Sequence, residues 1–353
     1  MDNKLNSLID KALSRRSFLA GAGSVAAASV ITGCSENGTA ATSPTPSSGY
    51  TDADVLNFAL NLEYLEAQFY LYAATGKGLS AADTAAPSGY TGTYTMGTVT
   101  TNSSVAQVAG GITTAQQQII NEIAYEEQEH VRFLRAALGP AAVPMPSIDL
   151  TFFAPLAALA TTGSTAPPLA NFSPFASFNA FLVGAFIFED VGVTAYAGAA
   201  PLISAAGVTS GYLTAAAGIL AVEAYHAAYI RTAITASAIQ AGSATAYPYI
   251  TYANNVATLR NSLTVGNNSA APGMGTGNTG AAGSSTSVEV PLVLPTGLTT
   301  PSSIVAADSS HAIGFARTVN QVHHIVYGSA TVGAKSGGFF PNGTNSIFAT
   351  TTA

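Results

Sequence analysis

Four long segments with helical periodicity constrain the fold of this chain more than any other feature. Apolar residues recur at three- and four-residue steps over about residues 52–75, 114–138, 173–199 and 210–240. At the helical rise per residue, each segment forms a helix of roughly 35 Å or more. Polar, glycine-rich stretches separate the segments. Four long helices of this kind predict an all-α fold built on a four-helix bundle.

Local signals indicate where three of these helices begin. Thr51 is the expected N-cap of the first helix, with Asp54 in its acidic first turn. Thr114 and Gln117 have the spacing of a capping box for the second helix. The pair Ser173-Pro174 predicts the start of the third helix, with the serine as N-cap and the proline at the first helical position.

Acidic and imidazole side chains are scarce, and they fall at matching positions in the four segments. Two of the five His have a Glu three residues before them, which puts each pair on one helical face. The first and third segments each place a Glu in their apolar stripe, with a Tyr seven residues later. The pairs are Glu127 and His130, Glu223 and His226, Glu63 and Tyr70, and Glu189 and Tyr196. The chain therefore has two matching halves.

The physical reason to group these residues is the cost of burying charge. A carboxylate within an apolar run such as residues 186–189 loses roughly several kcal/mol of hydration unless it is protonated, hydrogen-bonded or metal-bound. Four carboxylates and two imidazoles can chelate and bridge two divalent cations, and this ligand set suits iron or manganese. The pattern predicts a di-metal carboxylate centre of the kind that bundles hold. The alternative is a pair of hydrogen-bonded Glu and His networks without metal.

The same pattern resembles the ferritin-like superfamily. Residues 57–70 are similar to the opening helix of the exported ferritin-like domain family, which includes plant and bacterial desiccation-related proteins, and residues 315–343 are similar to its C-terminal segment. The resemblance covers about residues 51–350 and implies a ferritin-like bundle that binds metal. Carried over by position, the implied metal ligands are Glu63, Glu127, His130, Glu189, Glu223 and His226. Glu127 and Glu223 are the expected bridges between two Fe or Mn ions.

Three further residues are expected beside this centre. Glu66 also points inward and is the alternative to Glu63, which is preferred because its spacing to Tyr70 mirrors that of the third helix. Tyr70 and Tyr196 are expected to hydrogen-bond ligand carboxylates, to take part in electron transfer, or to serve as core aromatics.

Other polar residues receive structural assignments. The solvated side of the second helix is expected to carry Glu122, Glu126, Glu129, Arg132 and Arg135. For Asp190 the sequence allows two positions, one beside the metal ligands in a supporting role and one on the protein surface. The three His without acidic neighbours at ligand spacing are expected to be structural or exposed, and these are His311, His323 and His324.

The N-terminal residues have the features of an export signal. Residues 14–19 match a twin-arginine motif, which is followed by an uncharged stretch of moderate hydrophobicity at 19–33. Residues 30–34 resemble a lipobox that ends in Cys34, the only cysteine. We expect residues 1–33 to be a removable signal peptide that engages the twin-arginine translocase, and Cys34 to carry a lipid anchor to the membrane. The alternative for Cys34 is a small buried cysteine, with ordinary signal-peptidase cleavage nearby.

The remaining organisation follows from composition. Residues 34–50 are rich in Ser, Thr, Pro and Gly and predict a flexible linker. The bundle is expected over 51–242, and a loop-rich C-terminal appendage over 243–353, with short helices near 247–263 and 315–327 and a strand-like run at 288–294. A net charge of −7, with no basic cluster beyond the first sixteen residues, argues against nucleic-acid binding.

Several functions remain open at this stage. The first is an exported periplasmic or cell-envelope lipoprotein whose di-metal centre performs redox chemistry on dioxygen or peroxide in stress protection. The alternative is a non-catalytic envelope or desiccation-stress protein whose metal site is structural or absent. Iron storage is disfavoured because a tethered chain with a long tail does not suit a closed shell, although a homo-oligomer stays open. A membrane-embedded bundle is disfavoured because Glu189, Glu223 and His226 interrupt the most apolar helices.

Overall fold

A computed structural model of the protein describes residues 49–108, 111–162, 172–264, 288–294, 304–308 and 312–351. These residues belong to one compact unit that spans positions 44–353. The expected signal peptide, the lipidation site at Cys34, most of the linker and His311 lie outside the described residues.

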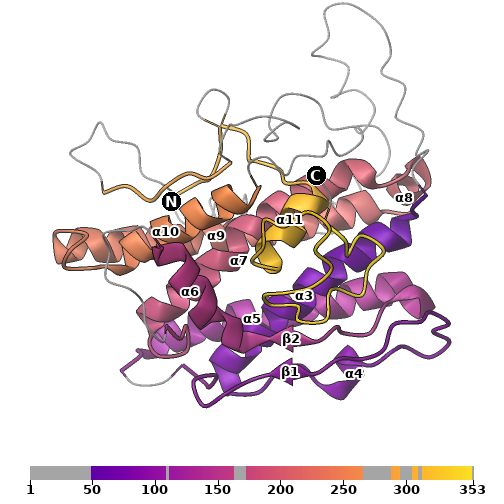
Figure 1. The fold of residues 1–353 in the computed structure, drawn as a ribbon, viewed down its shortest axis with the longest axis horizontal. Coiled ribbons are helices and arrows are strands. Elements are labelled where there is room, and N and C mark those ends of the chain that lie inside the picture. The colour runs from indigo at the N-terminus through magenta and orange to yellow at the C-terminus, as the bar shows by residue number, and fades with distance from the viewer. Residues whose placement is uncertain are drawn as a thin grey trace, which may run out of the picture. The chain divides into compact units, whose positions relative to one another are not determined.

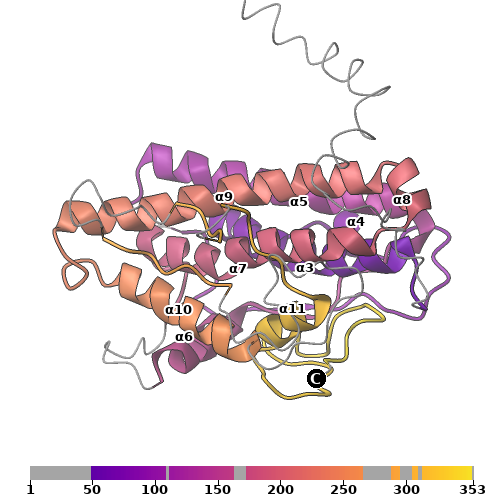
Figure 2. The same ribbon diagram turned by 90° about the horizontal axis from the view of Figure 1, so that it is seen from above.

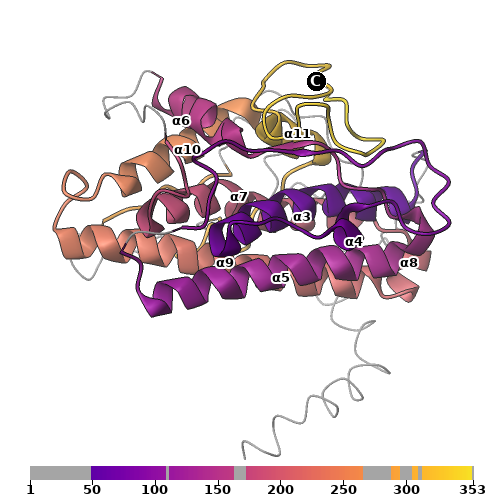
Figure 3. The same ribbon diagram turned by 90° about the horizontal axis from the view of Figure 1, so that it is seen from below.

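The four expected long helices are confirmed. They are α3 (Asp52–Thr75), α5 (Thr114–Leu138), α7 (Phe178–Ala199) and α9 (Tyr212–Ala241). Helix α3 packs along α5, and α7 packs along α9, so each predicted half of the chain forms a helix pair. Figures 2 and 3 show three layers, with α5 and α9 on one side, α3 and α7 in the middle, and shorter helices on the other side. The chain is thus an all-α bundle.

The first two long helices begin after capping residues, and one of the two predicted caps needs a correction. Thr51 and Asp54 form a complete capping box on α3. On α5 the box uses Thr113 and Gln116 instead of Thr114 and Gln117, because the extended backbone at Thr113 lets its hydroxyl accept the amide of Gln116. Two adjacent Thr-x-x-Gln frames overlap in this sequence, and spacing alone does not separate them.

The expected start of the third helix at Ser173-Pro174 is wrong. Helix α7 begins at Phe178, and Ser177 caps it by accepting the amide of Ala180 at 3.2 Å. Ser173 instead forms a separate turn, in which its carbonyl accepts the amide of Ala176. Helix α9 begins two residues later than expected, after Gly211 in the left-handed conformation, and α8 (Ala205–Thr209) precedes it.

Shorter elements fill the connections and the C-terminal part. They are α4 (Ala81–Thr84), α6 (Phe153–Thr161), α10 (Tyr249–Thr264), α11 (Val319–Val326), and the strands β1 (Val99–Thr100) and β2 (Ile148–Asp149), which pair in parallel. Single 3-10 turns cover Gly139–Ala141, Leu150–Phe152 and Ala200–Leu202. Helix α11 is shorter than the expected 315–327. The run 288–294 forms no strand, because Asn254 of α10 satisfies the amide and carbonyl of Leu292.

C-terminal segments pack against α3 and α7. The side chain of Asn61 bonds the backbone of Asn345 in both directions. The amide of Arg317 donates to the carbonyl of Thr194 at 2.9 Å, and a Cβ at Gly198 would lie 1.8 Å from the Arg317 carbonyl oxygen. Only glycine therefore permits this close backbone approach.

The two described C-terminal histidines, His323 and His324, are fully buried. Burial lowers the pKa of His323 to about 4, and its ring nitrogens lie 3.0 Å from the Val319 carbonyl and 3.0 Å from the Thr344 hydroxyl. His323 is therefore a neutral structural residue. Of the two roles expected from the sequence, structural or exposed, the first holds.

Two helical segments, residues 178–202 and α9, are long and apolar enough to cross a membrane by length and composition. The first is buried within the protein over 89% of its apolar window, which accounts for its hydropathy as a core helix. The second is only 28% buried, but its charged residues Glu223, His226 and Arg231 all lie on the buried side.

Candidate metal centre

The six expected ligands meet at the middle of the bundle, one or two from each long helix. Their side chains come from four different turns that face the space enclosed by α3, α5, α7 and α9. All six are buried, with residue exposures from 0% to 8%, and they are Glu63, Glu127, His130, Glu189, Glu223 and His226.

These residues form two groups that share one carboxylate. In the first group, Nδ1 of His130 lies 3.3 Å from Glu63 Oε2, 3.4 Å from Glu127 Oε2 and 3.7 Å from Glu223 Oε1. In the second group, Nδ1 of His226 lies 3.0 Å from Glu127 Oε1 and 3.4 Å from Glu189 Oε2. Within each group the ligand atoms lie within 4.8 Å of one another.

Glu127 belongs to both groups and offers one oxygen to each. This is the arrangement expected of a bridging carboxylate. Glu223, the other expected bridge, lies in the first group only.

The centre leaves buried polar atoms without hydrogen-bond partners in the described part of the chain. These atoms are Glu63 Oε2, Glu127 Oε1, Glu189 Oε2, both oxygens of Glu223 and Nδ1 of His226. Unpartnered buried atoms are rare in proteins because each one carries an uncompensated desolvation cost. Carboxylate oxygens and imidazole nitrogens that converge in this way fit a pair of divalent metal ions, and the set of donors suits iron or manganese.

Two tyrosines orient the carboxylates across the bundle. The hydroxyl of Tyr70 on α3 donates to Oε1 of Glu189 on α7, and the hydroxyl of Tyr196 on α7 donates to Oε1 of Glu63 on α3. Each tyrosine thus holds the outer oxygen of the other half's glutamate and leaves Oε2 to face the centre. Two of the expectations from the sequence therefore hold together, because Tyr70 and Tyr196 are core aromatics and also hydrogen-bond the carboxylates of Glu189 and Glu63.

Burial and mutual charge set the protonation of the metal-free cluster. Burial raises the pKa of Glu63 to about 7 and that of Glu223 well above its ordinary value. For Glu127 burial acts in the same direction, but the proximity and charge of both histidines outweigh it and hold the pKa at about 2. Burial opposes the charged imidazoles, yet Glu63 raises the pKa of His130 to about 11 and Glu189 raises that of His226 to about 12.

Binding of two divalent cations, one in each group, is therefore expected to release at least two protons per chain near pH 7. Both imidazoles are protonated in the metal-free cluster, and Nδ1 must lose its proton before it can bind metal. Because both pKa values lie above the ordinary 6.5, affinity rises with pH through the neutral range and falls on acidification. Calorimetric titration with Mn²⁺ in buffers of different ionisation enthalpy measures the number released. A heat that is independent of the buffer would contradict this assignment.

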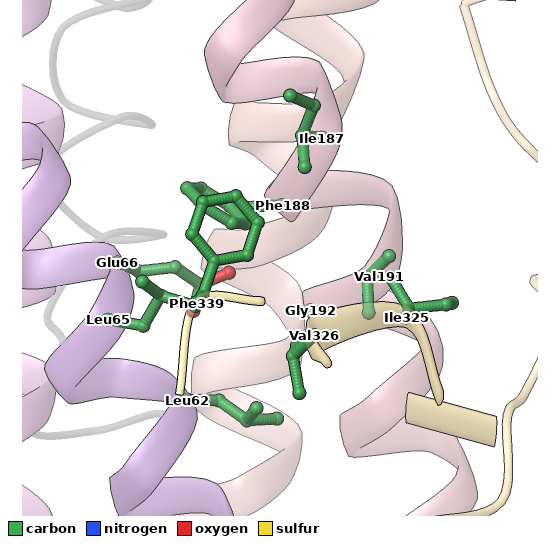
Figure 4. Close-up of a pocket in the computed structure, with 10 residues that line it drawn as sticks. All are labelled: Leu62, Leu65, Glu66, Ile187, Phe188, Val191, Gly192, Ile325, Val326 and Phe339. Atoms are coloured by element: carbon green, nitrogen blue, oxygen red, sulfur yellow. The ribbon is translucent and has the colours of Figure 1, made fainter. Parts of the chain in front are cut away.

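Glu66 stands apart from both groups. It is 5% exposed, and its side chain faces a cavity of about 20 Å³ (Figure 4). The other walls are apolar except for Gly192, and they come from α3, α7, α11 and the C-terminal Phe339. Burial raises the pKa of Glu66 well above its ordinary value. The structure thus places Glu63, rather than Glu66, with the converging atoms.

Gly192 makes the centre sterically possible. A Cβ at this position would lie 2.3 Å from Oε2 of Glu223 and 3.4 Å from Oε1 of Glu66. The absent side chain therefore gives Glu223 the space that it occupies.

Sequence reasoning missed one contact at the centre. Glu126, expected on the solvated side of α5, places Oε2 2.6 Å from Nε2 of His226 while its own side chain stays 35% exposed. Nothing in the local spacing indicates this contact, because the partner lies 100 residues away on α9. Arg135, also expected in solvent, donates to the hydroxyl of Tyr64 at 2.5 Å.

Asp190 is buried, which settles the choice left open by its sequence position. Its Oδ2 accepts hydrogen bonds from Arg231 at 2.8 Å and from Arg260 at 3.1 Å. Arg260 also reaches Glu289 at 2.6 Å, and Glu289 contacts Arg317. An ionic network thus runs beside the centre and joins α7 and α9 to the C-terminal part.

A four-helix bundle whose helices all send carboxylates or imidazoles to one buried centre defines a ferritin-like protein. The chain belongs to the ferritin-like domain family, which matches residues 51–236. This confirms the family that the opening helix and the Glu and His spacing indicated.

Two relatives give the family match more detail. The desiccation-related protein PCC13-62 of Craterostigma plantagineum is 31% identical over 215 residues, which are 60% of this chain and 62% of that protein's length. The ferritin-like catalase Nec2 of Nesocodon mauritianus is 28% identical over 296 residues, or 83% of each chain. No solved structure matches the chain.

Proposed function

We propose that the protein binds two iron or manganese ions in this centre and uses them for redox chemistry on dioxygen or peroxide. The observation that carries the proposal is the convergence of unpartnered oxygens and a nitrogen from four buried glutamates and His226. The relative that is named a catalase supports peroxide as the substrate. In that reaction one peroxide is oxidised to dioxygen and another is reduced to water, so no further reductant is required.

Bound iron or manganese would supply the electron transfer by changing oxidation state. The chain's own residues supply orientation, proton storage and exclusion of water. Tyr70 and Tyr196 hold the outer oxygens of Glu189 and Glu63, which fixes the inner oxygens toward the ions. Glu66, whose pKa burial raises well above its ordinary value, is placed to hold a proton at the wall of the small apolar cavity, next to Glu223. The apolar walls around it exclude bulk water from the centre.

A second function rests on the way the helices are joined. The six residues come from all four long helices, so a bound metal pair would cross-link the bundle without any turnover. The relative named as desiccation-related agrees with such a stabilising role. We further propose that the protein acts outside the cytoplasm, in the periplasm or cell envelope, because of the twin-arginine and lipobox motifs that end at Cys34.

Metal content separates these functions from a metal-free bundle. We expect about two Fe or Mn ions per chain by elemental mass spectrometry, and none in the variant Glu127→Ala/Glu223→Ala. Glu129→Ala, whose side chain is largely exposed on α5, is the matched control and should bind as the unaltered protein does. Evolution of dioxygen from hydrogen peroxide by the loaded protein would support the redox function. Metal-dependent melting without turnover would support the stabilising role, and absence of metal after anaerobic reconstitution would contradict both.

A further inference from the structure

A groove between α5 and α9 reaches the centre from outside. Its cavity has a volume of about 360 Å³, and we call it the α5/α9 groove. It is lined by Ile119, Glu122, Ile123, Glu126, Val222, Tyr225, His226 and Tyr229. Figures 2 and 3 show α5 and α9 on the side of the bundle away from α6, α10 and α11, so these helices do not cover it.

The floor of the groove is a histidine of the centre itself. The ring of His226 presents Nε2 to Glu126 at 2.6 Å and Nδ1 to Glu127 at 3.0 Å. The side chain of Glu126 is 35% exposed, whereas that of His226 is only 6% exposed. The imidazole of His226 thus separates the solvated carboxylate of Glu126 from the buried carboxylate of Glu127. A path inward from the groove therefore passes from Glu126 to Glu127 across this ring.

The groove is acidic, and both of its carboxylates come from α5, in the first of the two matching halves of the chain. Glu122 lies one turn before Glu126 on α5, and the lining residues include no Lys or Arg. In the second half of the chain, Val222 occupies the position that corresponds to Glu126, one residue before the Glu of the Glu-x-x-His motif. The two histidines of the centre thus differ in their outer surroundings.

The other cavity beside the centre does not suit a cation. It has a volume of about 20 Å³, and its walls are apolar apart from the single carboxyl of Glu66. A hydrated divalent ion that entered it would lose its water without gaining oxygen ligands, which is strongly unfavourable. The α5/α9 groove, in contrast, offers carboxylates at successive depths.

We propose that the α5/α9 groove is the inlet through which divalent cations reach the centre, with Glu122 and Glu126 as successive carboxylates and the His226 ring as the inner gate. This inference rests on the proposed metal centre. The two carboxylates attract the cation and replace part of its hydration shell. Contact between a cation and Glu126 weakens the hold of Glu126 on Nε2, which frees the ring to turn and open the way to Glu127.

The test measures the rate of metal uptake separately from the amount bound. In the Cys34→Ser protein, which has no other cysteine, Tyr225→Cys places one thiol at the rim of the groove. The folded protein is then capped with a bulky neutral methanethiosulfonate, so that the block cannot disturb folding. Co²⁺ is added alone, and its visible absorption is followed by stopped flow. Capped Ala236→Cys, exposed on α9 about three turns further along, is the matched control.

We expect the capped Tyr225→Cys protein to take up Co²⁺ at least about tenfold more slowly than the capped control, with the same final amount bound. Glu126→Gln should also slow uptake by about tenfold and weaken its dependence on salt, whereas Glu129→Gln, exposed on the same helix, should not. Uptake at the control rate by both altered proteins would overturn the inlet and leave the metal centre standing. Absence of Co²⁺ binding in the unaltered protein would overturn the metal centre and the inlet together.

Discussion

Glu127→Gln is expected to abolish binding of both metal ions, whereas Glu223→Gln is expected to leave one. Glu127 is the carboxylate shared by the two groups, and its oxygens face His130 and His226 separately. Glu223 contributes to the first group only, so its loss leaves Glu127, Glu189 and His226 in place. Glutamine keeps the size of the side chain but lacks the negative charge that both cations require.

Elemental analysis and calorimetric titration with Mn²⁺ measure this difference directly. The expected stoichiometries are close to zero for Glu127→Gln, one for Glu223→Gln, and two for the exposed control Glu129→Gln. Circular dichroism of the three metal-free proteins checks that the bundle persists. Equal losses in the Glu127 and Glu223 variants would show that both carboxylates bridge, as the sequence alone suggested.

The convergence of the six Glu and His residues could be predicted because their signal is local. A Glu three residues before a His lies on one face of a helix whatever surrounds it, and an isolated carboxylate in an apolar stripe requires a partner. The pattern occurs in both halves of the chain, and this repeat indicated that Glu63 and Glu189 lie at the same centre as the two Glu and His pairs. The lengths of the four helices were predictable for the same reason, since a long apolar periodicity needs no knowledge of tertiary contacts.

Contacts between distant segments carry no such signal. Glu126 has the same exposed position in its helix as many surface glutamates, and only the approach of α9 brings His226 to it. The predicted start of a helix was wrong where two adjacent residues could cap it equally well, as at Thr113 and Thr114. The run at 288–294 has the composition of a strand, but side chains of α9 and α10 bond its backbone instead of another strand.

The ionic network around Asp190 is the largest structural feature that the sequence concealed. Its members lie on α7, α9, α10 and two C-terminal segments, at separations of up to 123 residues for the contact of Arg317 with Thr194. The two arginines that contact Asp190 are almost fully buried, and Arg260 also stacks over the ring of Phe186 with 4.7 Å to the centroid. Buried guanidinium groups are tolerated only where carboxylates compensate them.

Asp190→Asn is therefore expected to lower the free energy of unfolding by about 3–5 kcal/mol, because it removes the charge that Arg231 and Arg260 share inside the protein. Glu129→Gln is the matched control, since Glu129 pairs with Arg132 at 2.8 Å while both side chains are more than 40% exposed. That change should cost less than about 1 kcal/mol. Denaturation in urea with chelator present measures both values without any contribution from metal.

A double-mutant cycle distinguishes loss of charge compensation from loss of packing. Arg231→Met removes one of the cations that Asp190 compensates and keeps much of the side-chain volume. If uncompensated charge dominates, Asp190→Asn combined with Arg231→Met will be less destabilised than the sum of the two single variants. Strict additivity would contradict the ionic interpretation, and the network would then stabilise the fold mainly by filling the space between α7, α9 and α10.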